Sequence, residues 1–196
     1  MEFSFVFIIN SILLGVGLAM DAFSVSLANG LNEPGMKKPR MLQIAGTFSV
    51  FQILMPLIGW VCIHTIAQKF EAFQKYITWI ALILLAYIGG KMLIEGIKNK
   101  GEEAGESEPV GFIALMVQGI ATSIDALSVG FTIADYSSVM AIAASLIIGV
   151  VTLVICITGL LLGRKFGVKL AGRANILGGV ILIGIGLEIF ISHVFM

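Results

Sequence analysis

The segments GVGLAMDAFSV (residues 15–25) and GIATSIDALSV (residues 119–129) decide the fold prediction, because the second repeats the first. Both contain the pattern Asp-Ala-x-Ser-Val, with Asp21 in the first copy and Asp125 in the second, 104 residues apart. Each copy lies inside a long apolar run. Repetition at a fixed offset indicates an internal duplication. We therefore expect two related halves, each with an aspartate inside an apolar helix.

The composition around these segments indicates a membrane protein. Of the 196 residues, 58% are hydrophobic and 12% are charged, whereas a soluble domain is about half apolar and about a quarter charged. The formal net charge is +0, so no basic excess suggests a nucleic-acid partner. The sequence contains no Gly-x-x-x-x-Gly-Lys-(Ser/Thr) loop, and no polar segment is long enough for a nucleotide-binding domain. We therefore expect no nucleotide partner either.

Six apolar segments are long enough to cross a bilayer, which takes about 20 residues. They are residues 5–28, 41–67, 73–96, 110–134, 139–163 and 173–194. The predicted fold class is thus an all-α integral membrane protein with six transmembrane helices. Residues 1–97 would form the first three-helix repeat, residues 98–109 an acidic cytoplasmic linker, and residues 110–196 the second repeat.

The distribution of basic residues predicts the orientation in the membrane. The first, third and fifth connections carry Lys37, Lys38, Arg40, Lys98, Lys100, Arg164, Lys165, Lys169 and Arg173, whereas the second carries Lys69 and Lys75. Lysine and arginine favour the cytoplasmic side, so both termini are expected outside. Three spans in each half is an odd number, so the second half would be inverted relative to the first. Inverted repeats with a polar site near the midplane are a recurrent plan of secondary transporters.

Polar side chains share a helical face with each aspartate. Ser24 lies three residues after Asp21, and Asn29 lies at the shoulder of that face. In the second copy, Gln118, Thr122 and Ser128 accompany Asp125 at helical spacing. The repeat partner of Asn29 is Ile133, so any role for Asn29 would make the site asymmetric. A carboxylate in a spanning helix costs several kcal/mol and normally faces a partner or a cavity. The simpler alternative is that each aspartate only bonds a neighbouring helix.

Other polar residues of the predicted spans could join this pathway. Gln52 lies one turn before Pro56 in the second span, and a helical proline frees a backbone carbonyl that could serve an ion. Glu95 shares a face of the third span with Lys91, as an ion pair or as part of a gate. Glu188, in the sixth span, could join the site or pair with a basic group.

The chemistry of these groups favours a hard divalent cation. Carboxylate, amide and hydroxyl oxygens suit Mg²⁺, Mn²⁺ or Ca²⁺, and the sequence has no cluster of His and Cys for a softer metal. Two aspartates would neutralise such an ion. Once the ion leaves, two carboxylates facing one another at low dielectric should take up at least one proton. Metal–proton exchange is the resulting hypothesis, with the metal as substrate and no resident cofactor.

The two aspartate segments, as they stand in residues 19–30 and 119–130, resemble the signature segments of the MntP-type bacterial manganese exporters. Residues 51–60 and 89–96 extend the similarity, which covers essentially the whole chain. The resemblance implies export of Mn²⁺ across the bacterial inner membrane by Asp21 and Asp125, and kinship with six-span exporters of the lysine-exporter type. The choice of manganese among hard cations rests on this resemblance alone.

Three alternatives compete with a manganese exporter. An exporter of another divalent cation or of an amino acid would use the same architecture. An intramembrane aspartyl protease also places two aspartates in separate helices, but Asp125 follows Ser123-Ile124 rather than Gly-x-Gly. A motif repeated in similar form suits a transport pathway better than two distinct catalytic carboxyls. We therefore expect a transporter and not an enzyme, with the oligomeric state left open.

Overall fold

The computed structural model describes residues 5–65 and 110–170, together with residues 79, 82–83, 86–87, 89–91, 93–94, 97, 176–177, 180–184, 187 and 191. Most of the predicted third and sixth spans, the whole linker 98–109, and the candidate residues Glu95 and Glu188 lie outside this part. The described elements are α1 (Phe5–Asn32), α2 (Lys38–Thr65), α4 (Phe112–Ala121), α5 (Ile124–Thr132) and α6 (Ser138–Leu170).

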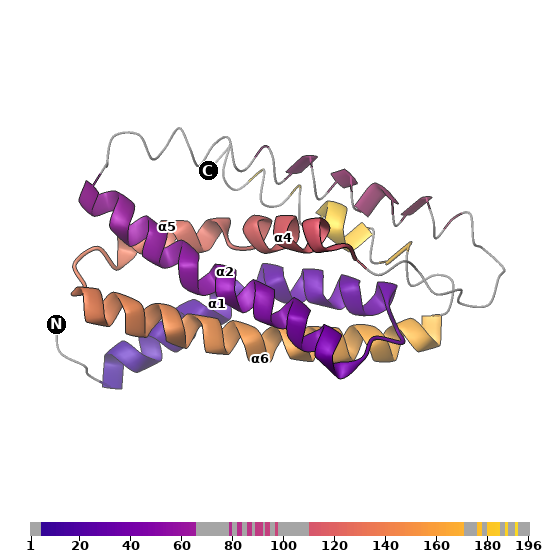
Figure 1. Cartoon of the computed structure of the whole chain (residues 1–196), viewed down its shortest axis with the longest axis horizontal. Helices are drawn as coiled ribbons and strands as arrows, with labels where there is room; N and C mark the ends of the chain where they lie inside the picture. The colour runs from indigo at the N-terminus through magenta and orange to yellow at the C-terminus, as the bar shows by residue number, and fades with distance from the viewer. Residues whose placement is uncertain are drawn as a thin grey trace.

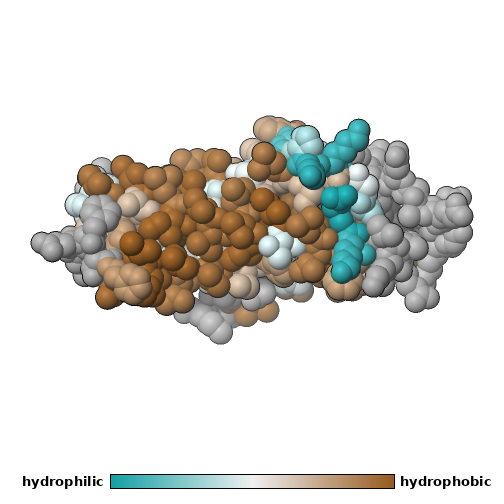
Figure 2. Space-filling model, turned by 90° about the horizontal axis from the view of Figure 1, so that it is seen from below, coloured by the Kyte–Doolittle hydropathy of each residue, from teal (hydrophilic) through white to brown (hydrophobic). Residues whose placement is uncertain are grey.

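The described residues are helical, without strands, and suit a bilayer. Helices α1, α2 and α6 are each long and apolar enough to span it, and α4 with α5 forms a fourth candidate span. Apolar side chains cover most of the visible surface, and hydrophilic ones gather near one end (Figure 2). At that end α1 stops, α2 starts and α6 stops (Figure 1). The all-helical, multi-pass membrane fold is therefore confirmed.

The fourth predicted span, residues 110–134, consists of two helices and not of one continuous helix. Helix α4 ends at Ala121, α5 begins at Ile124, and the two are bent by 44° (Figure 1). The Thr122 hydroxyl donates to Gln118 O at 2.9 Å, and the Ser123 hydroxyl donates to Gly119 O at 2.7 Å. Hydroxyls that bond the preceding turn compete with the helical ladder and bend helices. The break therefore lies just before Asp125.

The helix of the fifth predicted span is longer than residues 139–163. Helix α6 continues to Leu170, so Arg164, Lys165 and Lys169 belong to its last turns rather than to a connection. Basic residues there complement the negative end of the helix dipole. Arg164 also donates from Nε to Pro34 O at 3.2 Å, which ties this end of α6 to the turn between α1 and α2.

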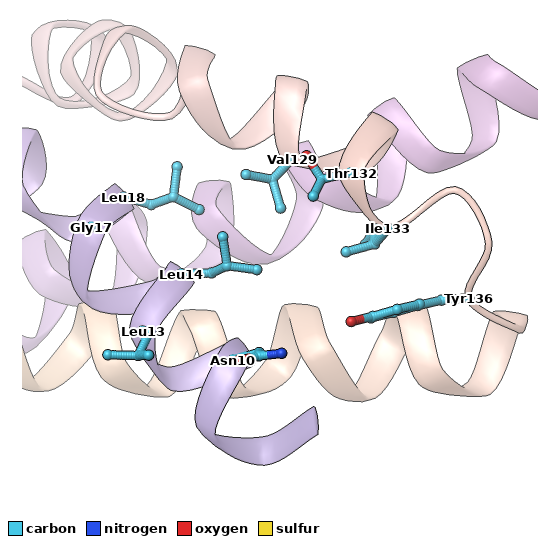
Figure 3. A pocket seen from close by; sticks show the side chains of 9 residues that line it. All are labelled: Asn10, Leu13, Leu14, Gly17, Leu18, Val129, Thr132, Ile133 and Tyr136. Carbon is cyan, nitrogen blue, oxygen red and sulfur yellow. The ribbon is translucent and has the colours of Figure 1, made fainter. Parts of the chain in front are cut away.

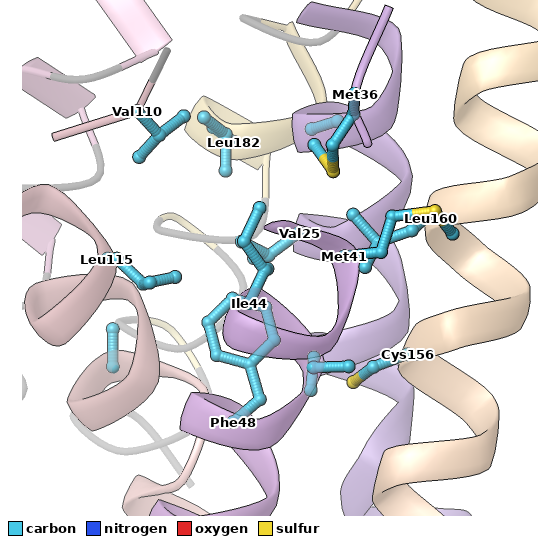
Figure 4. Close-up of a cluster of buried hydrophobic side chains, with 14 of the residues drawn as sticks. Val25, Met36, Met41, Ile44, Phe48, Val110, Leu115, Cys156, Leu160 and Leu182 are labelled. Atoms are coloured by element: carbon cyan, nitrogen blue, oxygen red, sulfur yellow. The ribbon is translucent and has the colours of Figure 1, made fainter. Parts of the chain in front are cut away.

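Glycines set how closely the helices pack. Helix α1 lies mainly against α6, and α2 packs against both α6 and α5. A β-carbon on Gly159 of α6 would lie 2.8 Å from Phe23 O of α1, and one on Gly59 of α2 would meet Leu127 O of α5 and Gly130. Small residues allow such backbone approach between membrane helices. On the side of α2 that faces α4 and α6, Phe48 packs into a buried apolar cluster (Figure 4).

We predict opposite effects for alanine at two glycines of α2. Gly59→Ala places a methyl group against α5, and such overpacking typically costs about 1–3 kcal/mol. The melting midpoint in detergent should fall by roughly 3–10 °C. Gly46→Ala is the control, since a β-carbon at Gly46 has nothing within 4 Å. It should leave the midpoint unchanged or raise it through better helix propensity. Equal midpoints for the two variants would contradict this packing.

Candidate functional site

The two aspartates occupy different local environments. Asp21 is half-buried in the middle of α1, with helix on both sides. Asp125 is half-buried in the first turn of α5, directly after the break. A carboxylate in the first turn interacts favourably with the positive end of the helix dipole. Within the described ranges, no three His, Cys, Asp or Glu side chains gather into a metal site. A cation held by these aspartates would thus need other oxygen ligands.

Gln52 of α2 connects the segments that precede the two aspartates. It is completely buried, and its Nε2 donates to Leu18 O at 2.8 Å and to Thr122 O at 3.5 Å. Leu18 and Thr122 are repeat counterparts, each three residues before its aspartate. Two carbonyl acceptors fix which way the amide points, because the flipped amide would place oxygen against oxygen. The Gln52 Oε1 that remains is buried with no hydrogen-bond partner among the described residues.

Asn29 and Gln118 form a closed amide pair between α1 and α4. Asn29 Nδ2 donates to Gln118 Oε1 at 2.8 Å, and Gln118 Nε2 donates to Asn29 Oδ1 at 3.3 Å. Both side chains are completely buried. The sequence singled out both residues without predicting that they bond each other. Along the chain, Asn29 lies about two helical turns after Asp21, and Gln118 lies about two helical turns before Asp125.

The hydroxyl residues of the predicted stripes are mostly engaged by the backbone. Ser24 donates to Met20 O at 3.1 Å, and Thr122 bonds the end of α4. The bend of 44° also prevents Gln118 and Thr122 from sharing one straight face with Asp125, which corrects the continuous stripe. Ser128 is half-buried one turn after Asp125. Because its hydroxyl bonds the end of α4, Thr122 contributes to the break between α4 and α5.

Contacts between the helices recur in matched pairs. A β-carbon on Gly15 of α1 would lie 3.1 Å from Val151 Cβ of α6, and one on Gly119 of α4 would meet the Phe51 ring of α2. The repeat offset of 104 residues relates Gly15 to Gly119. The second and fifth spans align at an offset of 100, through the identities Val50/Val150 and Gly59/Gly159, and that offset relates Phe51 to Val151. The contacts of Gly59 and Gly159 match by the same two offsets. The repeat in the sequence is thus accompanied by a repeat in packing.

One further contact joins two residues that are counterparts of each other. Ser49 of α2 donates from its hydroxyl to Gly149 O of α6 at 2.8 Å, and these positions are 100 residues apart. A contact between repeat counterparts is expected where two related halves meet. This pair was not predicted from the sequence, although the offset of 100 between the second and fifth spans could have indicated it.

A cavity of about 540 Å³ opens between α1 and the segment formed by α5 and the turn after it (Figure 3). Its walls are mostly apolar and include Leu14 and Leu18 on one side and Val129 and Ile133 on the other. Gly17 in its wall is one turn before Asp21, and Val129 is one turn after Asp125. The cavity therefore reaches within one turn of each aspartate along the chain.

The cavity and the amide pair lie on opposite sides of the aspartates. On α1 the order is cavity residues, Asp21, then Asn29; on α4 and α5 it is Gln118, Asp125, then cavity residues. The basic residues around the α1–α2 turn and the end of α6 are beyond the amide pair. The cavity thus lies nearer to the end of the molecule without those basic residues.

Comparisons with known proteins agree on one family. The family described as "Putative manganese efflux pump" matches residues 35–190. A protein of Sorangium cellulosum named "Putative manganese efflux pump MntP" is 44% identical over 186 residues, covering 93% of this chain and 95% of the relative. A protein of the same name from Ruminiclostridium cellulolyticum is 44% identical over 184 residues, with coverage of 94% and 95%. No solved structure shows significant similarity to the chain.

We predict that the cavity is filled with water in the membrane. In a background carrying Cys62→Ser and Cys156→Ala, Gly17→Cys should react with a charged, membrane-impermeant methanethiosulfonate reagent, since a hydrated thiolate attacks the sulfur of such a reagent and displaces methanesulfinate. Ile142→Cys is the matched control, because Ile142 is exposed on the outer surface of α6 and is nearer to a helix end. It should remain unmodified in lipid. Labelling of Ile142→Cys but not of Gly17→Cys would show that the cavity is dry.

Proposed function

The chain belongs to the family described as "Putative manganese efflux pump", and from that premise we propose that it is a secondary transporter that exports Mn²⁺ from the bacterial cytoplasm. The observation that carries the proposal is one half-buried aspartate in each of two repeated segments, with a cavity within one turn of both. The family is one of transporters, so the protein is not an enzyme. Mn²⁺ is the transported substrate of this proposal.

We propose further that the two halves are inverted three-helix repeats, residues 1–97 and 110–196, joined by the linker 98–109. The matched glycine contacts support this, because both offsets must hold at once for a contact to recur. The Ser49–Gly149 bond also supports it, since a two-fold axis maps such a contact onto itself. Three spans in each half require the inversion, and this architecture places the site where the halves meet.

The proposed Mn²⁺ site consists of Asp21, Asp125 and the amide oxygen of Gln52. Leu18 O lies near the level of Asp21, because a helical carbonyl points to the residue four positions on. The Gln52 amide is bonded to that carbonyl and to the one before α5, so it lies at the level of both aspartates. A buried acceptor without a partner is costly, and an amide oxygen is a suitable ligand for Mn²⁺. A hydrated ion would complete its shell with water.

Exchange of Mn²⁺ for protons would return the site to its starting state. Two carboxylates neutralise one divalent cation, which lowers the cost of holding it in the bilayer. When Mn²⁺ leaves through the cavity, protons from the outside solution would replace it on the carboxylates. Their release to the cytoplasm would make the site available for the next ion. Proton entry down its gradient would thus drive Mn²⁺ out.

The basic end of the molecule supports the proposed orientation in the bacterial inner membrane. Lys37, Lys38 and Lys165 are exposed at that end, and positive residues remain on the cytoplasmic side. The turn from α1 to α2 would then be cytoplasmic, and the N-terminus and the cavity mouth would face outward. The C-terminus would also be outside, in the six-span arrangement.

We predict that Asp21→Asn and Asp125→Asn each abolish export. Cells that produce either variant should accumulate as much Mn²⁺ as cells without the protein, because one charge of the site is lost. Asp135→Asn is the matched control, since Asp135 is exposed in the turn after α5. It should retain full export. Normal export by both site variants, with folded protein in the membrane, would contradict the proposal.

Flux measurements in vesicles that contain the purified protein can identify the cargo and the coupling ion independently. A Mn²⁺ gradient should move protons in the opposite direction, detected with a pH-sensitive dye, and Asp21→Asn should stop both fluxes. Mn²⁺ flux without proton movement would leave the exporter intact and refute proton exchange. Flux of Mg²⁺, Cd²⁺ or lysine in place of Mn²⁺ would instead reassign the cargo.

We predict that Gln52→Leu raises the KM for Mn²⁺ by about tenfold or more, as loss of a group that tunes a metal site commonly does. Gln43→Leu is the control, because Gln43 is exposed on the same helix and accepts a hydrogen bond from Arg40. It should leave KM unchanged. A purely structural Gln52 would lower the amount of folded protein and the maximal rate per cell without changing KM.

A further inference from the structure

The buried amide pair and the open cavity are related to each other by the internal repeat. Adding the offset of 104 residues to Asn29 gives Ile133, and subtracting it from Gln118 gives Leu14. Leu14 and Ile133 both line the cavity, from α1 and from the turn after α5 (Figure 3). Equivalent positions are therefore in direct contact on one side of the aspartates. On the other side they line a cavity, with Leu14 half-buried and Ile133 buried in its wall.

The side of the amide pair is closed by packing as well as by hydrogen bonds. Leu115, one turn before Gln118 on α4, packs in the buried cluster with Ile44 and Phe48 of α2 (Figure 4). Beyond it, a guanidinium nitrogen of Arg40 donates to Val110 O, which joins the start of α2 to the segment before α4. Polar and apolar contacts thus seal the same end of the molecule.

We propose that Asn29 and Gln118 are the inner gate of the transporter, closed in this structure, and that Leu14 and Ile133 are the outer gate, open in this structure. The proposal rests on the proposed export function, because a gate acts only on a path across the membrane. In the alternate state the amide pair separates and the two apolar side chains come together. A two-fold relation between the halves predicts such an exchange of contacts.

The chemistry of the two gates suits the two sides of an exporter. When the amide pair opens, each amide can exchange its lost partner for water or for the hydration shell of an entering cation, so the hydrogen-bonding groups stay satisfied. When Leu14 and Ile133 meet, the contact expels water from an apolar neck, as in hydrophobic constrictions that gate by dewetting. An ion entering from the cytoplasm therefore meets polar groups, and one that has left meets an apolar barrier to return.

Cross-linking across each gate tests the proposal. In the Cys62→Ser, Cys156→Ala background, the double variant Asn29→Cys with Gln118→Cys should cross-link readily under mild oxidation. Mn²⁺ efflux from vesicles should fall at least tenfold on linking and recover on reduction. The pair Leu14→Cys with Ile133→Cys is the matched test of the other gate, and its linkage should also block efflux reversibly. Unchanged efflux after complete linkage of either pair would overturn the assignment of that gate.

Accessibility gives a readout that does not depend on the cargo. With Gly17→Cys added to the inner pair, linkage across the inner gate should keep Gly17→Cys reactive toward the impermeant reagent from outside. Linkage that abolishes this reactivity would refute the gate even if efflux stops. If the unlinked parent moves no Mn²⁺ but the labelling result is as expected, the export function fails and the gate assignment stands for another cargo. A merely structural amide pair would lower stability without producing reversible, link-dependent blockage.

Discussion

A carboxylate inside a bilayer must be solvated by the protein or by water that the protein admits, because lipid offers it neither hydrogen bonds nor counter-charge. Around Asp21 and Asp125 the described helices make both provisions. Gln52 places a buried amide oxygen between the segments that precede them, and the cavity reaches within one helical turn of each along the chain. Asp125 gains in addition the positive end of α5. The break in the fourth span creates that helix end, so it would contribute directly to the proposed site.

The glycine contacts make this arrangement of polar groups attainable. The Gln52 side chain can reach Leu18 O and Thr122 O only if α1 and the α4–α5 segment approach α2 closely. Gly59 allows α5 to approach α2, because a β-carbon there would meet Leu127 O, and Gly159 likewise allows α1 to approach α6, where a β-carbon would meet Phe23 O. With no hydrophobic drive between helices in lipid, close packing and such hydrogen bonds hold the bundle together. The same close packing would thus stabilise the bundle and position the ligands of the proposed site.

The sequence predicted the features that depend on local pattern, and it did not predict those that depend on specific hydrogen bonds. Apolar length alone predicted α1, α2 and α6, and the Asp-Ala-x-Ser-Val repeat singled out both aspartates. The break at Thr122 escaped prediction because threonine and serine are tolerated within membrane helices, and only their bonds to the preceding turn reveal a bend. The hydrogen bond between Asn29 and Gln118 was not predicted, because the repeat relates Asn29 to Ile133 and gives no indication that Gln118 is its partner.

The chemical difference between Asn29 and its counterpart Ile133 bears on the relative stability of the two conformations of a transporter built from inverted repeats. Two identical halves would make the inward-facing and outward-facing conformations equally stable, since the two-fold operation would convert one into the other. Asn29 and Gln118 differ chemically from their counterparts Ile133 and Leu14, so the two closures have different free energies. A buried amide pair loses its partners on separation unless water enters, whereas a pair of apolar side chains separates only when water wets the neck. In the proposed cycle, these differences between counterparts would make water the factor that decides which side opens. A hydrated cation that arrives at the amide pair would bring that water with it.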